Sequence, residues 1–185
     1  LCTHCLHDLP LTNFHRSTDT PLDKVFWGRV PVFRTAALYF FVKGGKVQHL
    51  VHQLKYKGMR EAGIFPGELL GKELIKEKDF STIDLIIPVP LHPGKLKKRG
   101  YNQSELFAAG LSESTGIPVN TEVFIRTVAT ETQTRKGRFA RFENVKEIFQ
   151  VTTPELLLNK HILLVDDVIT TGSTLESCAN VLLQV

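Results

Sequence analysis

The sequence lacks the features that mark several classes of protein. Its 185 residues include only three cysteines, too few for a disulfide framework, so a reducing cytoplasm is the expected location. No apolar run approaches the ~18 residues of a membrane span, and no basic segment followed by an apolar one opens the chain. We therefore expect no membrane partner and no secretion signal.

The sequence also lacks the phosphate loop of nucleotide hydrolases. That loop requires G-x-x-x-x-G-K-[ST], and the nearest stretch, GELLGKE at 67–73, is one residue short and lacks the hydroxyl. The net charge of +4 and pI near 9.0 are compatible with phosphate ligands or nucleic acid but specific for neither.

Apolar periodicity predicts an alternation of strands and helices. Strands are expected at 35–45, 83–90, 118–128, 146–151 and 161–167, and helices at 46–58, 62–78, 101–115 and from Ser173 onward. Pro66 is expected near the start of its helix, and Asn102 and Glu105 are placed like a capping box. This alternation is typical of an α/β fold, a mostly parallel sheet flanked by helices, with ligands beyond the carboxyl ends of the strands.

The stretch LLVDDVITTGSTL, residues 163–175, carries the strongest chemical signal. Backbone N–H groups, hydroxyls and a helix N-terminus can converge there on a phosphate. The predicted phosphate-binding residues are Ile169, Thr170, Thr171, Gly172, Ser173 and Thr174. Asp166 and Asp167 are hydrogen-bond acceptors that suit sugar hydroxyls, or a hard cation such as Mg²⁺ directly or through water. Phosphate donors beside such acceptors predict a ribose 5-phosphate site; a capped helix with two solvated acids is the plainer alternative.

The stretch ILLVDDVITTGSTL resembles the signature with which type I phosphoribosyltransferases bind phosphoribosyl pyrophosphate (PRPP). Three further segments, LCTHCLHDLP at the start, LVHQLKYKG at 50–58 and DLIIPVPLHPGKLKKRGYNQSELFA at 84–108, resemble the competence protein ComF family. The resemblance covers essentially the whole chain.

This resemblance implies two domains. Residues 1–30 would form an N-terminal segment, part of a zinc ribbon, and residues 31–185 a type I phosphoribosyltransferase core. Such a core normally carries another strand after the last helix, so we expect its C-terminal end to be incomplete here.

The resemblance also implies roles for individual residues. Asp166 and Asp167 would hold the ribose 2- and 3-hydroxyls, and the loop from Ile169 to Thr174 the 5-phosphate. A loop after an earlier strand would take the pyrophosphate, with Pro90, Leu91, His92, Lys95, Lys98 and Arg99 as its residues. Arg99 is favoured as a catalytic ligand beside the two acids, because a guanidinium pairs two phosphate oxygens at once. The plainer alternative for this cluster is an exposed basic loop.

A long polar stretch, 129–142, resembles the flap that closes over the site in such enzymes. Arg126, Gln133, Arg138 and Arg141 lie in or beside it. Closure would exclude water from an oxocarbenium-like centre while a nitrogen nucleophile displaces Mg²⁺-pyrophosphate. Nothing in the sequence identifies the acceptor.

Cys2 and Cys5 form half of a structural zinc site, which needs about four ligands. The resemblance implies a further cysteine pair, but the only other cysteine, Cys178, lies on the apolar face of the last helix and is expected in the core. A pair upstream of Leu1, or one of His4, His7 and His15, are the alternatives for completing the site.

Two functions of other classes remain open. One is a PRPP-sensing module without catalysis. The other is an interaction protein of the competence machinery that binds single-stranded DNA or a helicase-like partner through its basic surface.

Overall fold

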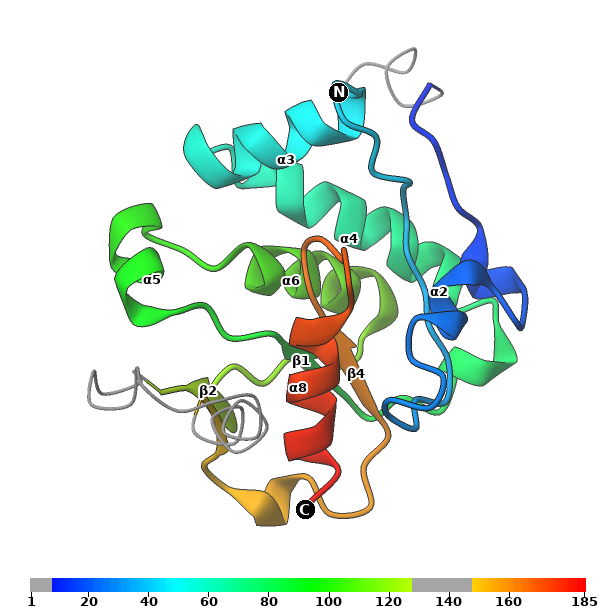
Figure 1. Cartoon of the computed structure of the whole chain (residues 1–185), viewed down its shortest axis with the longest axis vertical. Helices are drawn as coiled ribbons and strands as arrows, with labels where there is room; N and C mark the ends of the chain where they lie inside the picture. The colour runs from blue at the N-terminus through cyan, green and yellow to red at the C-terminus, as the bar shows by residue number, and fades with distance from the viewer. Residues whose placement is uncertain (1–7, 128–147) are drawn as a thin grey trace.

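The chain forms both helices and strands, as expected for an α/β fold, although three of the described helices come before the first described strand (Figure 1). The computed structural model describes residues 8–127 and 148–185. Its helices are α2 (Pro21–Lys24), α3 (Lys46–Tyr56), α4 (Glu61–Leu74), α5 (Pro93–Arg99), α6 (Gln103–Thr115) and α8 (Ser173–Leu182). Its strands are β1 (Leu85–Pro88), β2 (Phe124–Arg126), β3 (Phe149–Val151) and β4 (Ile162–Val165). Short 3₁₀ turns cover Phe14–Arg16, Lys78–Phe80 and Pro154–Leu156.

The centre of the fold is a parallel pair, β1 and β4. Leu85 lies opposite Ile162 and Pro88 opposite Val165, and Val119 adds a single parallel bridge to Ile86. Strands β2 and β3 pair antiparallel, so the sheet structure of the described residues is only partly parallel.

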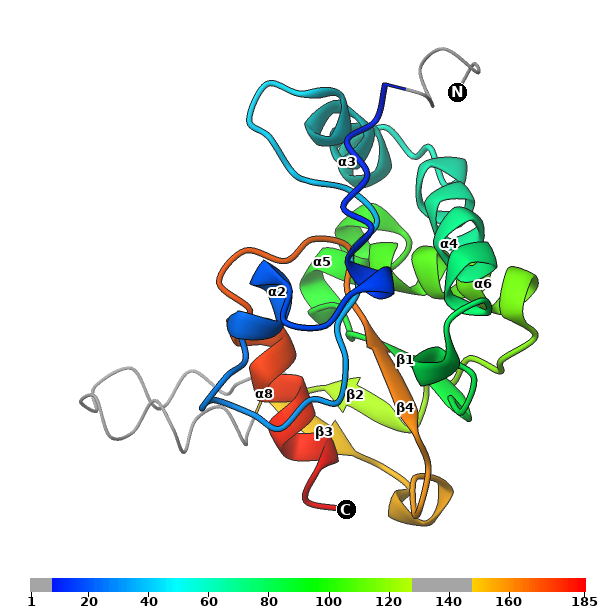
Figure 2. The same cartoon turned by 90° about the vertical axis from the view of Figure 1, so that its right-hand side faces the viewer.

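Helices cover both faces of the parallel pair. Helices α4 and α6 lie side by side on one face and α8 on the other (Figure 2). Because side chains alternate along a strand, neighbours in β1 belong to opposite cores. Ile86 packs with Leu70 and Leu111 of α4 and α6, whereas Ile87 packs with Cys178 of α8. Cys178 is fully buried, which confirms the expected core position, and burial raises the pKa of its thiol.

Glycines allow α4 and α6 to pack closely. Gly63, Gly67 and Gly71 recur every four residues on α4, and a Cβ at Gly67 would collide with the carbonyl oxygen of Phe107 on α6. Pro66 lies inside α4 rather than near its start, where its ring removes one intrahelical hydrogen bond. Burial of this helix against α6 offsets that loss.

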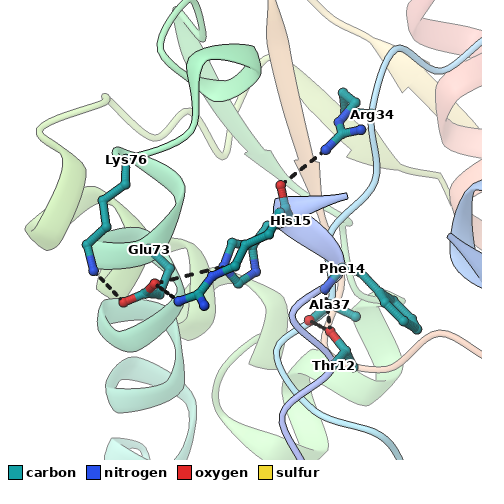
Figure 3. Close-up of polar contacts among 8 residues, drawn as sticks. Thr12, Phe14, His15, Arg34, Ala37, Glu73 and Lys76 are labelled. Atoms are coloured by element: carbon teal, nitrogen blue, oxygen red, sulfur yellow. Dashed lines mark hydrogen bonds and ion pairs between the residues drawn. The ribbon is translucent and has the colours of Figure 1, made fainter. Parts of the chain in front are cut away.

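The N-terminal segment is tied to α4 by charged groups (Figure 3). Arg16 Nη2 lies 2.6 Å from Glu73 Oε2, and the buried His15 ring lies 3.9 Å from the same oxygen. Burial, and then the charge of Arg16, lower the pKa of His15. Arg34 donates a hydrogen bond of 3.1 Å to the His15 carbonyl oxygen.

The strand expected at 35–45 is wrong. This segment makes only an isolated antiparallel bridge, between Leu11 and Tyr39, and Leu38 packs into the core beside α4. Ala36, Leu38 and Tyr39 therefore serve packing, whereas Phe40, Phe41 and Val42 are exposed.

Other sequence predictions hold with shorter bounds. The helix expected at 46–58 is α3, the helix at 101–115 is α6, and the last helix begins at Ser173. Asn102 caps α6 by accepting from the Ser104 N–H, while its side-chain amide, not its backbone, faces Glu105. None of the described helices is both long and apolar enough to cross a bilayer.

Candidate ligand site at the carboxyl end of strand β4

The two predicted acids lie where the parallel strands end. The Val89 N–H donates to the Val165 carbonyl oxygen at 2.8 Å, so pairing continues to the last residue of β4. Asp166 and Asp167 follow directly and are half-buried. This is the edge at which parallel α/β sheets bind ligands.

Asp166 is held by the N-terminal turn of α6. Its Oδ1 accepts from Ser104 Oγ at 2.9 Å and from the Asp167 backbone N–H at 2.8 Å. Burial, and then the neighbouring charge of Asp167, raise the pKa of Asp166 to about 6, although these hydrogen bonds and Lys55 oppose the rise. The carboxyl group is therefore ionised at neutral pH but close to its titration range.

Asp167 is held by α3. The Lys55 ammonium lies 2.6 Å from Asp167 Oδ2, and the two side chains are 22% and 15% exposed. The Tyr101 hydroxyl donates to the Leu54 carbonyl oxygen and so fastens the end of α3 to the start of α6. Lys55 thus reaches the acids from a helix more than one hundred residues away in the sequence.

Each acid therefore has one oxygen engaged by the protein, Asp166 Oδ1 through two hydrogen bonds and Asp167 Oδ2 through its ion pair with Lys55 alone, since that oxygen accepts no hydrogen bond from the described residues. Asp166 Oδ2 and Asp167 Oδ1 accept no hydrogen bond from residues 8–127 or 148–185. The two oxygens left over match the two hydroxyls of a ribose in number and in chemistry.

The same groups do not fit a directly bound Mg²⁺. Such an ion needs octahedral oxygen ligands at about 2.0–2.1 Å. The ammonium of Lys55 already occupies the surroundings of Asp167, and no cluster of three acidic, histidine or cysteine ligands occurs in the part of the chain that the structure describes.

The predicted phosphate loop follows the acids. Gly172 caps α8 with φ of +75° and has no side chain to cap the helix end, where the Ser173 N–H donates to Thr171 Oγ1 at 3.5 Å. A Cβ on Gly172 would lie 2.6 Å from Val25 Cγ1, because the N-terminal segment packs against this loop. The hydroxyl residues Thr170, Thr171, Ser173 and Thr174 are exposed, and Thr171 Oγ1 and Ser173 Oγ lie 2.9 Å apart. Backbone and hydroxyl donors are therefore accessible to a ligand.

Arg29 of the N-terminal segment also reaches this loop. It donates to the Thr171 carbonyl oxygen at 2.8 Å and forms an ion pair with Glu176 of α8. A second cation thus lies beside the predicted phosphate position.

The predicted pyrophosphate residues begin at the end of β1. Pro90, Leu91 and His92 are half-buried, and His92 caps α5 by accepting from the Gly94 N–H at 3.1 Å. The basic residues that follow lie on this short helix, which the sequence did not predict, instead of on a loop. Lys95 and Lys98 are exposed there and make no ion pair with any described residue.

Arg99 contacts residues that lie next in sequence to those holding the acids. It donates to Gln103 Oε1 at 2.6 Å, and its guanidinium lies 5.7 Å from the centre of the Tyr56 ring. Gln103 and Tyr56 are the sequence neighbours of Ser104 and Lys55, the two side chains that hold the acids.

The flap and zinc predictions fall mostly outside the described residues. Gln133, Arg138, Arg141, Cys2 and Cys5 belong to 128–147 and 1–7. Arg126, which is described, ends β2 opposite Phe149, and its guanidinium lies 5.3 Å from that ring. His15, considered as a zinc ligand, contacts Arg16 and Glu73 instead.

Sequence reasoning missed Lys55, Ser104 and Arg29. Lys55 and Ser104 lie inside two of the segments that resemble the ComF family, 50–58 and 84–108. That resemblance marked the segments but not the side chains, because only the fold brings them to the acids.

Comparison with known proteins gives relatives along the full chain. The chain is 33% identical to DNA utilization protein YhgH of Shigella flexneri over 188 residues, which span all of this chain and 78% of that protein. Competence protein F of Haemophilus influenzae is 37% identical over 100 residues, 54% of this chain and 44% of that protein. No family model matches.

Among solved structures, glutamine PRPP amidotransferase from B. subtilis, complexed with ADP and GMP, aligns with a TM-score of 0.49. It is 20% identical, and the alignment covers 72% of this chain and 28% of that one. That likeness is too weak to support an argument.

Proposed function

This chain belongs to the protein family of DNA utilization protein YhgH and competence protein F, and on that premise we propose that it binds PRPP and transfers its ribose 5-phosphate to a nitrogen acceptor. The reaction would take place in the cytoplasm. Mg²⁺ would enter with the substrate, as the counter-ion of the pyrophosphate. Zinc at Cys2 and Cys5 is a separate proposal for the N-terminal segment.

One observation carries this proposal. At the carboxyl end of β4, two adjacent acids each keep one oxygen that accepts from none of the described residues, directly before an exposed loop of hydroxyls and backbone donors. Acceptors for hydroxyls beside donors for a phosphate are the two halves of a ribose 5-phosphate site. A cavity of about 790 Å³, lined mainly by apolar residues, reaches Asp166, Asp167 and Ile169, while Thr170 to Thr174 do not line it.

The proposed reaction is a substitution at the anomeric carbon. The bond from that carbon to the pyrophosphate oxygen breaks, a bond to the acceptor nitrogen forms, and the acceptor loses one proton to solvent. The protein would contribute mainly orientation of the ribose and stabilisation of charge on the leaving pyrophosphate. Arg99 is the residue we propose for that charge, because a guanidinium can pair two phosphate oxygens.

Thermal unfolding with and without Mg²⁺-PRPP tests the binding step. Ligand at ~100 times its dissociation constant adds about 2.7 kcal/mol to the free energy of unfolding, a clear rise in Tm. The rise should vanish in the folded double variant Asp166→Asn, Asp167→Asn. A rise that persists there would refute the ribose assignment. Binding without pyrophosphate release on addition of candidate acceptors would favour a PRPP sensor over a transferase.

A second candidate function, binding of single-stranded DNA, is favoured by one surface. Tyr56 is 66% exposed at the end of α3 and its ring lies 4.8 Å from that of His52, while Lys97 is exposed on α5 nearby. Exposed aromatic rings among cations suit unpaired bases and their phosphates. The names of the relatives, DNA utilization protein and competence protein, also favour this candidate.

Fluorescence anisotropy with a labelled oligonucleotide tests it. Binding should weaken steeply as salt rises, and Tyr56→Ala should weaken it at every salt concentration. If Tyr56→Ala and the wild-type protein bind the oligonucleotide with equal affinity, this surface does not bind single-stranded DNA. A helicase-like partner would then be the remaining interaction candidate.

A further inference from the structure

Lys55 is an unusual neighbour for a predicted ligand site. Its side chain is 22% exposed and its ammonium lies 2.6 Å from Asp167 Oδ2, an oxygen that is fully buried. Taking a charged ammonium and a carboxylate out of water is costly unless the two are well paired. The pair is held firmly, since Tyr101 bonds the Leu54 carbonyl oxygen on one side and Arg99 packs over Tyr56 on the other.

We propose that Lys55 is a positioning residue that makes the Asp166–Asp167 pair a receptor for two vicinal hydroxyl groups and prevents the pair from binding a divalent cation directly. The inference rests on the proposed function for the identity of its ligand. Its claim about cations holds independently of PRPP.

Charge is the first argument. Two ionised acids carry two negative charges, and the Lys55 ammonium cancels one of them at 2.6 Å. A Mg²⁺ or Mn²⁺ ion at the acids would meet a fixed positive charge in a half-buried site, where repulsion is screened less than at the surface. Neutral hydroxyls meet no such repulsion.

Direction is the second argument. Lys55 engages Asp167 Oδ2, and Ser104 and a backbone N–H engage Asp166 Oδ1. The other oxygen of each acid has no donor among residues 8–127 and 148–185. A hydroxyl can donate to each remaining oxygen without breaking any of these contacts. A chelated cation would need both acids to turn toward it, and the Lys55 ion pair opposes that turn.

Manganese binding to the full chain at pH 8, followed by electron paramagnetic resonance, tests the cation claim without any sugar. The wild-type protein should bind Mn²⁺ weakly, and Lys55→Met should bind it at least about tenfold more tightly. Adding Asp167→Asn to that variant should abolish the gain. Lys57→Met is the matched control, because Lys57 directly follows the same helix and is exposed, and it should behave as wild type.

Ribose 5-phosphate binding without divalent metal, by calorimetry, tests the hydroxyl claim. Lys55→Met should weaken it at least about tenfold, and Lys57→Met should not change it. Should Lys55→Met fail to fold, Lys55→Gln removes the charge and retains a polar N–H donor on a shorter side chain, with the same expected results.

The two proposals fail in different ways. A folded Lys55 variant with wild-type affinity for both Mn²⁺ and ribose 5-phosphate would overturn the role of Lys55 and leave the proposed function standing. The proposed function would be overturned if the wild-type protein does not bind ribose 5-phosphate. Tighter Mn²⁺ binding by Lys55→Met in the same experiments would still support the role of Lys55 in excluding cations.

Discussion

The two walls of the candidate site are built in different ways. One wall is a single stretch from β4 through the loop to α8, and it presents exposed hydroxyls and free carboxylate oxygens. The other wall is assembled from α3, α5 and α6, and its Lys55, Tyr101 and Ser104 are half-buried or buried. Lys55 and Ser104 contact the acids, and Tyr101 bonds the carbonyl oxygen of Leu54, next to Lys55. The first wall carries the carboxylates and hydroxyls that can contact a ligand. The second wall sets the local charge and the orientation of the two carboxylates.

The largest effect on stability is expected at Gly172, on the first wall. Its φ is +75°, and a Cβ would lie 2.6 Å from Val25 Cγ1. Gly172→Ala should therefore combine backbone strain with a steric clash and lower the free energy of unfolding by about 2–4 kcal/mol. Gly100, between α5 and α6, has φ of +80° but nothing within 4 Å of its Cβ position.

Urea unfolding of both glycine variants separates the two causes. Gly100→Ala should show only the strain, about 1 kcal/mol. Equal losses at the two positions would mean that the contact between the N-terminal segment and the phosphate loop does not constrain Gly172.

Asp167→Asn should destabilise the protein by about 1–3 kcal/mol. The change removes the carboxylate that pairs with Lys55 and leaves the ammonium, 22% exposed, without its counter-charge. Thermal and urea unfolding at pH 8 measure the loss. If Lys55→Met restores stability in the Asp167→Asn background, the unpaired ammonium is the cause.

The same substitution one residue earlier should have the opposite sign. The pKa of Asp166, about 6, is raised above its ordinary 3.8, so between these values the folded protein holds a proton that the unfolded chain has released. This group therefore makes the wild-type protein more stable as the pH falls from about 7 to 4. The free-energy cost of holding an ionised Asp166 in the folded protein is greatest at high pH. Asp166→Asn should remove it.

At about 1.4 kcal/mol per pKa unit, Asp166→Asn should gain about 1–3 kcal/mol at pH 8 and nothing near pH 4. Unfolding of both proteins across this pH range gives the difference. If the gain in stability does not depend on pH, its cause is a change in packing instead of the loss of the Asp166 charge. PRPP binding by the wild-type protein should weaken below about pH 6, as protonated Asp166 loses an acceptor.

The smallest effect is expected at Tyr101, on the second wall. Tyr101→Phe removes the hydroxyl that bonds the Leu54 carbonyl oxygen and should lower stability by about 1 kcal/mol. Hydrogen exchange at the end of α3 should rise more than exchange in α8. A uniform rise in both helices would show that the bond does not fasten α3 locally.

Sequence patterns were sufficient to predict an element where residues that are close in the sequence are also close in the fold. The helices α3, α6 and α8 follow their apolar periodicity, and Asn102 caps α6 as its position indicated. The strand expected at 35–45 failed because apolar alternation also suits an extended segment that packs on the core and pairs through a single bridge. The helix α5 was missed because its basic residues bury no apolar face.

The sequence by itself determined the chemistry of one wall. A strand, two acids, a hydroxyl loop and a helix are consecutive, so their order alone places acceptors beside phosphate donors at a strand end. Only the tertiary structure decided what holds the acids. Lys55 and Ser104 lie 112 and 62 positions from the acids that they contact, and no local pattern encodes which buried charge a distant ammonium will pair. Electrostatics and packing act through space, and the fold sets those distances.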